Sequence, residues 1–191
     1  MRVAALWVTR TCFGLDDSMQ LFDVIDRRLS IRAYRATPVE RTKIEAIIAA
    51  TRLAPSAGDL QAYVILIAEK LETRARLAEA ALGQSFIAEA PVVLVFFADT
   101  RRSERTYGAR GATLFCVQDA TIAAAYAQLA AAAQDLGSCW VGAFDEARVA
   151  TILAAPAHLR PIALMPIGYP NEAPARPARR PLSELIRHER F

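Results

Sequence analysis

The sequence predicts an α+β fold, an α/β sandwich in which helices cover a central sheet. Segments with helical periodicity and segments with strand character alternate irregularly along the chain, and the helical segments dominate. Two runs, "YVILIAE" (63–69) and "PVVLVFFAD" (91–99), are unbroken in apolar character, which predicts strands buried on both faces. At 191 residues, without repeats or a clear linker, the chain is expected to form a single domain.

The first helix is expected to begin at a cap formed by Ser18. Its apolar face would consist of Phe22, Ile25 and Leu29, which follow one another at spacings of three and four residues. Such spacing places the three side chains on one side of a helix, so this side is expected to face the core.

A second helix is predicted from "TPVE" (37–40), which has the pattern of a capping box. Thr37 is the expected N-cap, Pro38 the first helical residue, and Glu40 the side chain that reaches back to the cap. The buried stripe of this helix is expected to consist of Ile44, Ile47 and Ile48.

The remaining elements are predicted by their end signals. The run "ETRARLAEAALG" (72–83) is expected to be a helix that ends at Gly83. A long helix over 111–136 is rich in small residues, which suits the centre of a fold or a dimer seam. The other expected elements are a loop or short strand at "SCWVGAF" (138–144), a helix capped by Asp145, a strand at "PIALMPIGYP" (161–170), and a Pro-spaced arm with a short final helix (171–191).

Composition excludes several classes of protein. Hydrophobic residues make up 54% of the chain, which predicts a large core or a buried subunit interface. The longest apolar run (91–98) is shorter than the roughly 20 residues that span a bilayer, so no membrane span is expected. The formal net charge is only +3 and the basic residues are scattered, which argues against a nucleic-acid surface.

The three cysteines predict neither a disulfide framework nor a zinc site. Cys12, Cys116 and Cys139 are odd in number and show no C-x-x-C spacing, so a reducing cytoplasm is the expected compartment. The first 17 residues resemble a signal peptide only superficially, because Arg10 interrupts a very short apolar stretch. Residues 1–18 are expected to be a dispensable extension of a domain over 19–191, with Met19 as an alternative start.

The motifs of hydrolysis and phosphoryl transfer are missing from the sequence. There is no G-x-G-x-x-G, no P-loop and no G-x-S-x-G, and His158 and His188 are the only histidines, so neither a catalytic triad nor a metal site is expected. What remains is a set of polar residues able to converge on a phosphate: Arg28, Ser30 and Arg32 in "RRLSIR", and Arg179 and Arg180 in "PARRPL".

The stretch "LAPSAGDLQAY" (53–63) has two interpretations. Pro, Ser, Gly and Asp are ordinary turn residues, so the stretch can be a plain turn between a helix and a strand. It can also be a loop that holds a ligand against the edge of the sheet. A third group, Arg101, Arg102, Arg105 and Arg110, is interpreted as a solvated loop in preference to a site for a nicotinamide phosphate.

The chain resembles the nitroreductase family of FMN-dependent oxidoreductases. The resemblance rests on blocks in family order that cover roughly residues 22 to 191: "RRLSIRAY", "APSAGDLQAY", "EAPVVLVFFAD", "YGARG…QDATIAA", "GSCWVGAF", "RPIALMPIGYP" and "RRPL". It implies a central mixed sheet flanked by helices, a homodimer with FMN at the subunit interface, and a C-terminal arm exchanged between subunits.

The resemblance also implies roles for individual residues. Arg28, Ser30 and Arg32 would hold the phosphate and the pyrimidine edge of FMN, and Arg179 or Arg180 would meet the phosphate. Backbone N–H groups of Gly142 and Ala143 would face flavin N5 and O4. The other implied cofactor residues are Pro55, Ser56, Asp59, Gln61, Trp140 and Val141. Asp59 stands where the family has Asn, and "QAY" stands where "QPW" is frequent, so the polar contacts and the pocket wall are expected to differ.

The resemblance implies hydride transfer from NAD(P)H through bound flavin to a nitroaromatic, a quinone or a related acceptor by a ping-pong mechanism. Alternatives are flavin breakdown for cobalamin lower-ligand synthesis, reductive dehalogenation, and a flavin-binding module without enzymatic activity. Gln118 and Asp119 are expected to serve the helix at the subunit interface.

Overall fold

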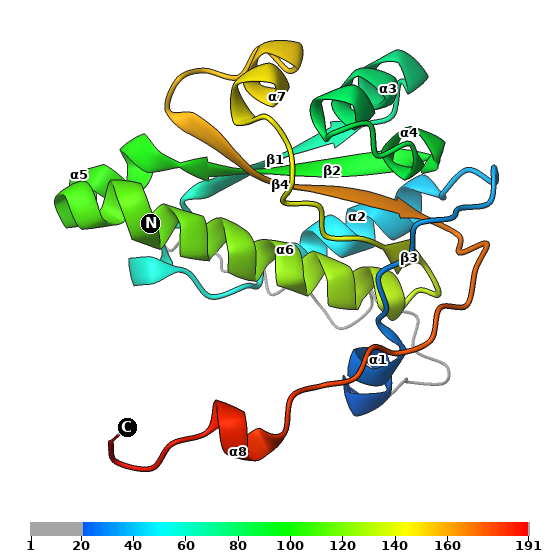
Figure 1. Ribbon diagram of the computed structural model, residues 1–191. Helices are drawn as coiled ribbons and strands as arrows, with labels where there is room; N and C mark the ends of the chain where they lie inside the picture. Colours follow the sequence, from blue (N-terminus) through cyan, green and yellow to red (C-terminus); the bar gives the residue numbers. More distant parts are fainter. Residues whose placement is uncertain (1–20, 191) are drawn as a thin grey trace, which may run out of the picture.

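A computed structural model describes residues 21–190, and an antiparallel sheet lies at its centre (Figure 1). The strand order is β1-β2-β4-β3, with every ladder antiparallel. The strands are β1 (Tyr63–Ala68), β2 (Val92–Asp99), β3 (Gly137–Ser138) and β4 (Leu159–Gly168). The expected Ser18 cap, the role of residues 1–18, the alternative start and Cys12 lie outside the described residues.

Helices cover both faces of the sheet, as the predicted sandwich requires (Figure 1). Successive residues of β2 point to opposite faces, so Leu94 and Phe96 join one core and Val93 and Val95 join the other. The first core is covered by α2 (Arg41–Thr51) and α6 (Cys116–Ala132). The second is covered by α3 (Leu71–Ala80), α4 (Phe86–Glu89) and α7 (Glu146–Ile152).

The two apolar strands differ in burial because only one of them is central. β2 pairs with a strand on each side and is buried along almost its whole length, as predicted. β1 lies at the edge, and Val64 and Ile67 are 39% and 44% exposed, so the prediction of burial on both faces is wrong for this strand. The mixed sheet is likewise not seen in residues 21–190, where the parallel bridge between Ser30 and Ser138 is isolated.

The predicted start of the second helix needs correction. α2 begins at Arg41, and the side chain of Glu40 makes no capping bond. The Glu40 carboxylate instead accepts a hydrogen bond from the Tyr169 hydroxyl at 2.7 Å, so the capping box is wrong because a residue far along the chain takes its carboxylate. The predicted stripe holds, since Ile44 and Ile47 are buried and Ile48 packs beside them.

α1 (Leu21–Arg27) turns a different face inward than predicted. Val24 is the buried residue, whereas Phe22 is 80% exposed and Ile25 is 45% exposed. Leu29 lies beyond the end of the helix and is half-buried. The expected face is therefore wrong, and α1 presents large apolar side chains to solvent in the single chain.

The long helical region begins earlier than predicted. α5 (Thr100–Arg110) replaces the expected arginine loop, and a π-helical turn (Gly111–Phe115) joins it to α6. The stretch Thr100–Ala132 is long and apolar enough to cross a membrane by length and composition. Five alanines of this stretch are fully buried in the core: Ala120, Ala123, Ala124, Ala127 and Ala131.

The ends predicted at Gly83 and Asp145 are confirmed, whereas α6 ends at Ala132, four residues before the predicted end. Gly83 adopts a left-handed φ of 74° just after α3, and the Asp145 carboxylate caps α7 by accepting the Arg148 N–H at 3.0 Å. Gly137 allows close approach, because a Cβ there would lie 2.7 Å from a side-chain carbon of Ile31. Beyond β4 the chain is an extended arm that carries α8 (Leu182–Leu185), and residues 181–190 are exposed throughout.

Candidate functional site

The segment that carries three predicted phosphate-binding residues, Arg28, Ser30 and Arg32, lies beside β3. The Ile31 N–H donates to the Ser138 carbonyl at 3.0 Å, which aligns the segment 28–32 with the start of the "SCWVGAF" stretch. Arg28 lines a cavity of about 250 Å³ that extends over Gly137 and Ser138. Burial raises the pKa of the Cys139 thiol, and the positive charges of Arg32 and Arg28 oppose that effect, so both guanidinium groups act on the same buried atom.

The stretch from Ser138 to Gly142 runs alongside β4. Ser138 pairs with Ile167, and Val141 exchanges backbone hydrogen bonds with Leu164 at 2.9 and 3.0 Å. An extended chain rises by roughly 3.3 Å per residue, so Gly142 lies about 13 Å from Ser138. The predicted phosphate residues and the predicted N–H donors therefore lie at two ends of one edge of the sheet, where Ser138, Cys139 and Val141 are buried and Gly142 is exposed.

The backbone at Gly142 and Ala143 can donate to a ligand. Both residues are exposed, and within residues 21–190 neither N–H has an intramolecular acceptor. A Cβ at position 142 would come within 3.2 Å of Trp140 Nε1, so the indole packs closely under this backbone. Two free donors next to each other suit an acceptor-rich ring edge.

Gln84, which the sequence analysis did not single out, holds this donor loop in place. Its side-chain amide donates to the Ala143 carbonyl at 3.1 Å and to the Ala81 carbonyl at 2.8 Å. The Asp145 N–H also donates to the Ala80 carbonyl at 2.9 Å. Gln84 directly follows Gly83, where a helix end was predicted, and this position was the only signal in the sequence for a role in a loop.

The stretch 55–62 forms a tightly wound loop against α6. The carboxylate of Asp119, which is 2% exposed, accepts the Ala57 N–H at 2.9 Å and the Ala62 N–H at 3.4 Å. Gly58 and Asp59 both adopt left-handed φ values, 55° and 54°, and a Cβ at Gly58 would lie 2.4 Å from the Tyr107 hydroxyl oxygen. Asp119 thus anchors the loop, a more specific role than the expected service to an interface helix.

The side chains of this loop point in different directions. Pro55 and Ser56 line a cavity of about 480 Å³ along α6. The Ser56 hydroxyl accepts the Gln61 N–H at 2.9 Å, and the Gln61 side chain donates to the Arg52 carbonyl at 3.1 Å. Asp59 is exposed and, among the described residues, makes no side-chain hydrogen bond or ion pair. Gln61 is therefore committed to its own loop, whereas Asp59 is available to a ligand.

A single chain does not bring the two halves of the predicted site together. The loop 55–62 packs on α6 at Asp119. The cavity at Arg28 is lined by Ala132, which is the last residue of α6. Thirteen residues of α-helix separate these positions, which is about 20 Å at 1.5 Å per residue.

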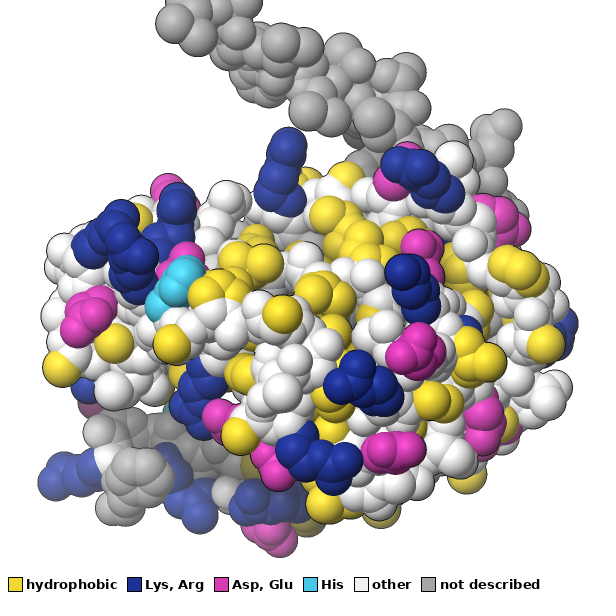
Figure 2. Space-filling model, turned by 90° about the horizontal axis from the view of Figure 1, so that it is seen from above, with side chains coloured by type: hydrophobic (Ala, Val, Ile, Leu, Met, Phe, Trp, Pro, Cys, Tyr) yellow, Lys and Arg dark blue, Asp and Glu magenta, His cyan; other side chains and the backbone are white. Residues whose placement is uncertain are grey.

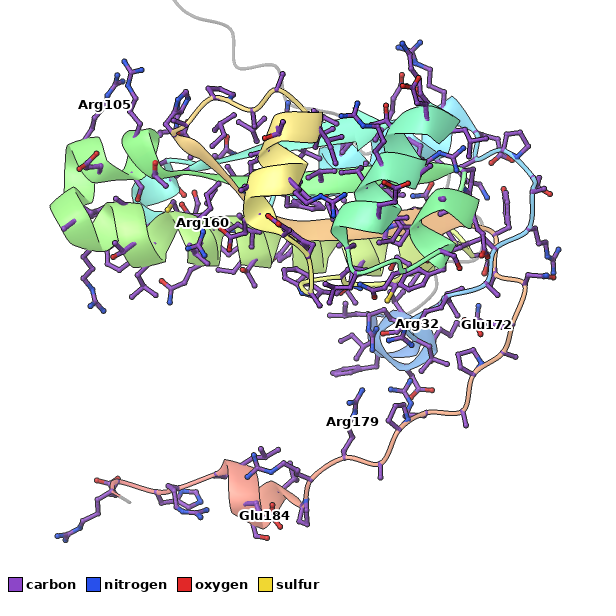
Figure 3. The ribbon with its side chains drawn as sticks, turned by 45° about the horizontal axis from the view of Figure 1, so that its top comes forward. Arg32, Arg105, Arg160, Glu172, Arg179 and Glu184 are labelled. Atoms are coloured by element: carbon purple, nitrogen blue, oxygen red, sulfur yellow. The ribbon has the colours of Figure 1, made fainter. Side chains whose placement is uncertain are left out.

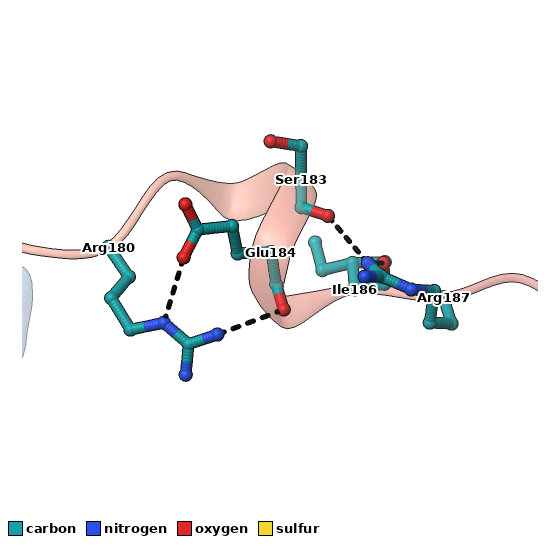
Figure 4. A network of polar contacts seen from close by, with 5 residues as sticks. All are labelled: Arg180, Ser183, Glu184, Ile186 and Arg187. Atoms are coloured by element: carbon teal, nitrogen blue, oxygen red, sulfur yellow. Dashed lines mark hydrogen bonds and ion pairs between the residues drawn. The ribbon is translucent and has the colours of Figure 1, made fainter. Parts of the chain in front are cut away.

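The two arginines of the arm also stay apart from the others. Arg180 pairs with Glu184 at 3.1 Å, and Arg187 donates to the carbonyls of Ser183 and Ile186, so these contacts remain inside the arm (Figure 4). Arg179 points from the arm toward the body of the molecule (Figure 3). Within residues 21–190, neither Arg179 nor Arg180 makes a hydrogen bond or ion pair with Arg28, Ser30 or Arg32.

The remaining arginine group lies at the opposite end of the molecule. Arg105 projects from α5 at the end of the sandwich that is remote from Arg32 (Figure 3). Arg101, Arg102, Arg105 and His158 line a small cavity of about 210 Å³. Figure 2 shows basic side chains gathered beside a histidine on this face, while elsewhere basic and acidic groups alternate. His158 precedes β4 and contacts α5 through its carbonyl, which accepts the Thr100 N–H at 3.0 Å.

No cluster of three or more potential metal ligands occurs in the part of the chain that the structure describes.

A family model described as the nitroreductase family matches residues 25–169. The chain belongs to the nitroreductase family. A protein from Thermus thermophilus named NADH dehydrogenase is 34% identical to it over 187 aligned positions, covering 84% of this chain and 91% of the relative. A Bacillus subtilis protein named FMN reductase [NAD(P)H] is 30% identical, covering 84% of this chain and 69% of the relative.

Solved structures of this nitroreductase-family fold superimpose closely. The structure titled NADPH:FMN oxidoreductase from Vibrio harveyi complexed with NAD+ has a TM-score of 0.83 and 26% identity, covering 90% of this chain and 77% of that one. The match confirms the α+β fold predicted from the sequence, and the family model spans Arg28, Ser138 and Gly142.

Proposed function

We propose that this chain transfers a hydride from NAD(P)H through bound FMN to a nitroaromatic, a quinone or a related acceptor, in two successive half-reactions. As a member of the nitroreductase family, the chain is an FMN-dependent NAD(P)H oxidoreductase. The acceptor class, the order of the half-reactions and the residues that hold the flavin are the proposal. The observation that supports it most directly is the edge that joins an arginine cluster to two free N–H donors.

The residues on that edge fit FMN. Arg28 and Arg32 offer two guanidinium groups for a phosphate, and Ser30 offers a hydroxyl on the same side of the segment, because side chains two residues apart in extended chain share a face. The N–H groups of Gly142 and Ala143, about 13 Å further along the edge, are free to donate to the ring. One end thus suits a phosphate and the other an isoalloxazine.

Each group on the chain has a separate task in this proposal. Arg28 and Arg32 bind the phosphate, and Arg179 of the arm adds a third charge. The N–H donors of Gly142 and Ala143 orient the ring and stabilise negative charge that develops at its edge. When bound, FMN supplies the redox chemistry, accepting a hydride on the ring and releasing it to the second substrate. The protein then needs no nucleophile, in agreement with the missing motifs.

A second copy of the chain completes the site in this proposal. The loop 55–61 lies about 20 Å from Arg28 along α6 in one chain, so this loop reaches the flavin only from another chain. Large apolar side chains are exposed in the single chain: Phe22 is 80% exposed on α1 and Leu182 is 71% exposed on α8. Among residues 21–190, β1 also has one edge without a neighbouring strand. We therefore propose a homodimer in which the C-terminal arms are exchanged.

Anaerobic reduction with NADH or NADPH, followed by a panel of quinones and nitroaromatics, tests the function. The expected result is bleaching of the flavin absorbance near one equivalent of reductant and its recovery on adding acceptor. A bound flavin that neither nicotinamide reduces would favour the non-enzymatic module. Loss of the flavin itself after aerobic turnover would favour the flavin-breakdown alternative.

Light scattering of a double variant tests the dimer. Replacing Leu182 and Leu185 with Asp should yield monomers that lose FMN, because both side chains are exposed in the single chain and would enter the interface. Leu71→Asp is the control, since Leu71 is 64% exposed at the start of α3. A flavin-loaded monomer in the double variant would contradict the exchanged arm.

A further inference from the structure

We infer that Glu172 is a positioning residue for the phosphate-binding segment of the site. This inference rests on the proposed function, which assigns Arg28, Ser30 and Arg32 to the phosphate. Glu172 lies just beyond β4, at the base of the arm. One oxygen of its carboxylate accepts two consecutive backbone N–H groups, those of Arg32 and Ala33, the latter at 3.2 Å. Figure 3 shows Glu172 facing the segment that carries Arg32.

Glu172 completes a set of contacts that hold the segment from both sides. On one side the Ile31 N–H donates to Ser138 at 3.0 Å. On the other, the Asn171 N–H donates to the Ala33 carbonyl at 2.9 Å, and the Arg35 N–H donates to the Tyr169 carbonyl at 2.9 Å. Between these anchors, the N–H groups of Arg32 and Ala33 have a side chain as their acceptor.

This acceptor sets the direction of the side chains that face the phosphate. The backbone at Arg32 cannot rotate without breaking the bond to Glu172, and Ser30 and Arg32 leave the segment on the same side. Holding donors in place before the ligand arrives removes part of the ordering cost of binding. Glu172 belongs to the arm, so its contact also ties the base of the arm to the phosphate segment.

The negative charge of Glu172 opposes phosphate binding, whereas its hydrogen bonds favour it. A carboxylate near a phosphate repels it, and Glu172 lies beside Arg32, whose backbone N–H it accepts. Glu172 and Arg32 are both exposed, so solvent and salt screen the repulsion. Direct hydrogen bonds to backbone are screened less, and we expect positioning to outweigh repulsion.

Release of FMN on dilution of the holoprotein distinguishes positioning from repulsion, because loss of positioning weakens FMN binding and loss of repulsion strengthens it. Glu172→Ala should weaken FMN binding about tenfold, the factor for one net hydrogen bond of about 1.4 kcal/mol. Glu172→Gln keeps an amide oxygen as acceptor and should stay within about threefold of the natural chain. Tighter binding in both variants, or unchanged binding in Glu172→Ala, would overturn the inference.

Two further measurements separate this inference from the proposed function. In the flavin-free full chain, amide hydrogen exchange at Arg32 and Ala33 should accelerate in Glu172→Ala and stay slow in Glu172→Gln. Glu45→Ala is the matched control, because Glu45 is an exposed carboxylate on α2 that pairs with Arg41. Unchanged exchange in Glu172→Ala overturns the positioning role, whereas a natural chain that binds no FMN overturns the proposed function.

Discussion

Asp119, buried in the first turn of α6, accepts the backbone N–H of Ala57 at 2.9 Å and so fixes the loop 55–62 to the longest helix among residues 21–190. The same carboxylate accepts the N–H of Ala62, a residue with no exposed surface. One buried side chain therefore sets the position of a loop whose own sequence reads as a simple turn. In the proposed site, this anchor would hold Pro55, Ser56 and Asp59 in position for the ligand.

Replacing Asp119 with Ala should destabilise the chain and weaken flavin binding together. Two N–H groups lose their acceptor, and the loss of buried hydrogen bonds to a charged group costs about 2–3 kcal/mol. Asp119→Asn keeps one acceptor oxygen and should lose less. Urea unfolding measures the stability, and Glu45→Ala, at an exposed position on α2, is the control. Equal stability of the Ala variant and the natural chain would show that water replaces the carboxylate.

Arg28→Ala should weaken FMN binding and lower its dependence on salt. A charge-assisted hydrogen bond to phosphate contributes about 1.5–3 kcal/mol, which corresponds to roughly ten- to a hundredfold in affinity. Affinity measured at several salt concentrations checks both effects. Arg41→Ala serves as control, because Arg41 pairs with Glu45 on the outer face of α2. A flavin affinity that is the same in both variants would remove Arg28 from the site.

Asp59→Asn should raise the midpoint potential of the bound flavin. An ionised Asp only accepts hydrogen bonds, and its charge disfavours a negatively charged reduced ring, whereas Asn can also donate. A change of about 1 kcal/mol in one charged hydrogen bond corresponds to roughly 20 mV for a two-electron couple. Redox titration at pH 7 checks the shift, with Glu104→Gln on α5 as control. A lower potential in Asp59→Asn would mean that this carboxylate points away from the ring.

Tyr169→Phe should reduce the acid sensitivity of folding. The hydrogen bond from the Tyr169 hydroxyl lowers the pKa of Glu40 below its ordinary value of 4.5. A lowered pKa stabilises the fold above pH 4.5, and this contribution is lost as the pH falls below 4.5 through the folded-state value. Tyr169→Phe should therefore be less stable at pH 7 and show a smaller further loss between pH 5 and pH 3. Urea unfolding across this range measures it, and an unchanged slope against pH would contradict the assignment.

Local patterns predicted the parts of the fold that depend on near neighbours in the chain. The Asp145 cap, the Gly83 stop and the strand at residues 91–99 were all predictable, because each depends on contacts within a few residues or on burial on both faces. The resemblance to a family came from ordered blocks, and it placed Arg28, Ser30 and Arg32 in one segment. The bridge between Ser30 and Ser138 places this segment beside the start of the stretch that leads to Gly142.

Only the tertiary structure decided which elements are peripheral and which groups meet. An apolar run cannot reveal whether its strand is central, so β1 was expected inside and lies at the edge. Glu40 matches the sequence pattern of a capping box, but in the fold its carboxylate accepts a hydrogen bond from Tyr169, 129 residues away. The separation of the loop 55–61 from Arg28 follows from the rigid length of α6, about 20 Å. Hydrogen bonds between distant residues, such as those of Asp119, Gln84 and Glu172, leave no periodic trace in a sequence, because their partners are chosen by the fold.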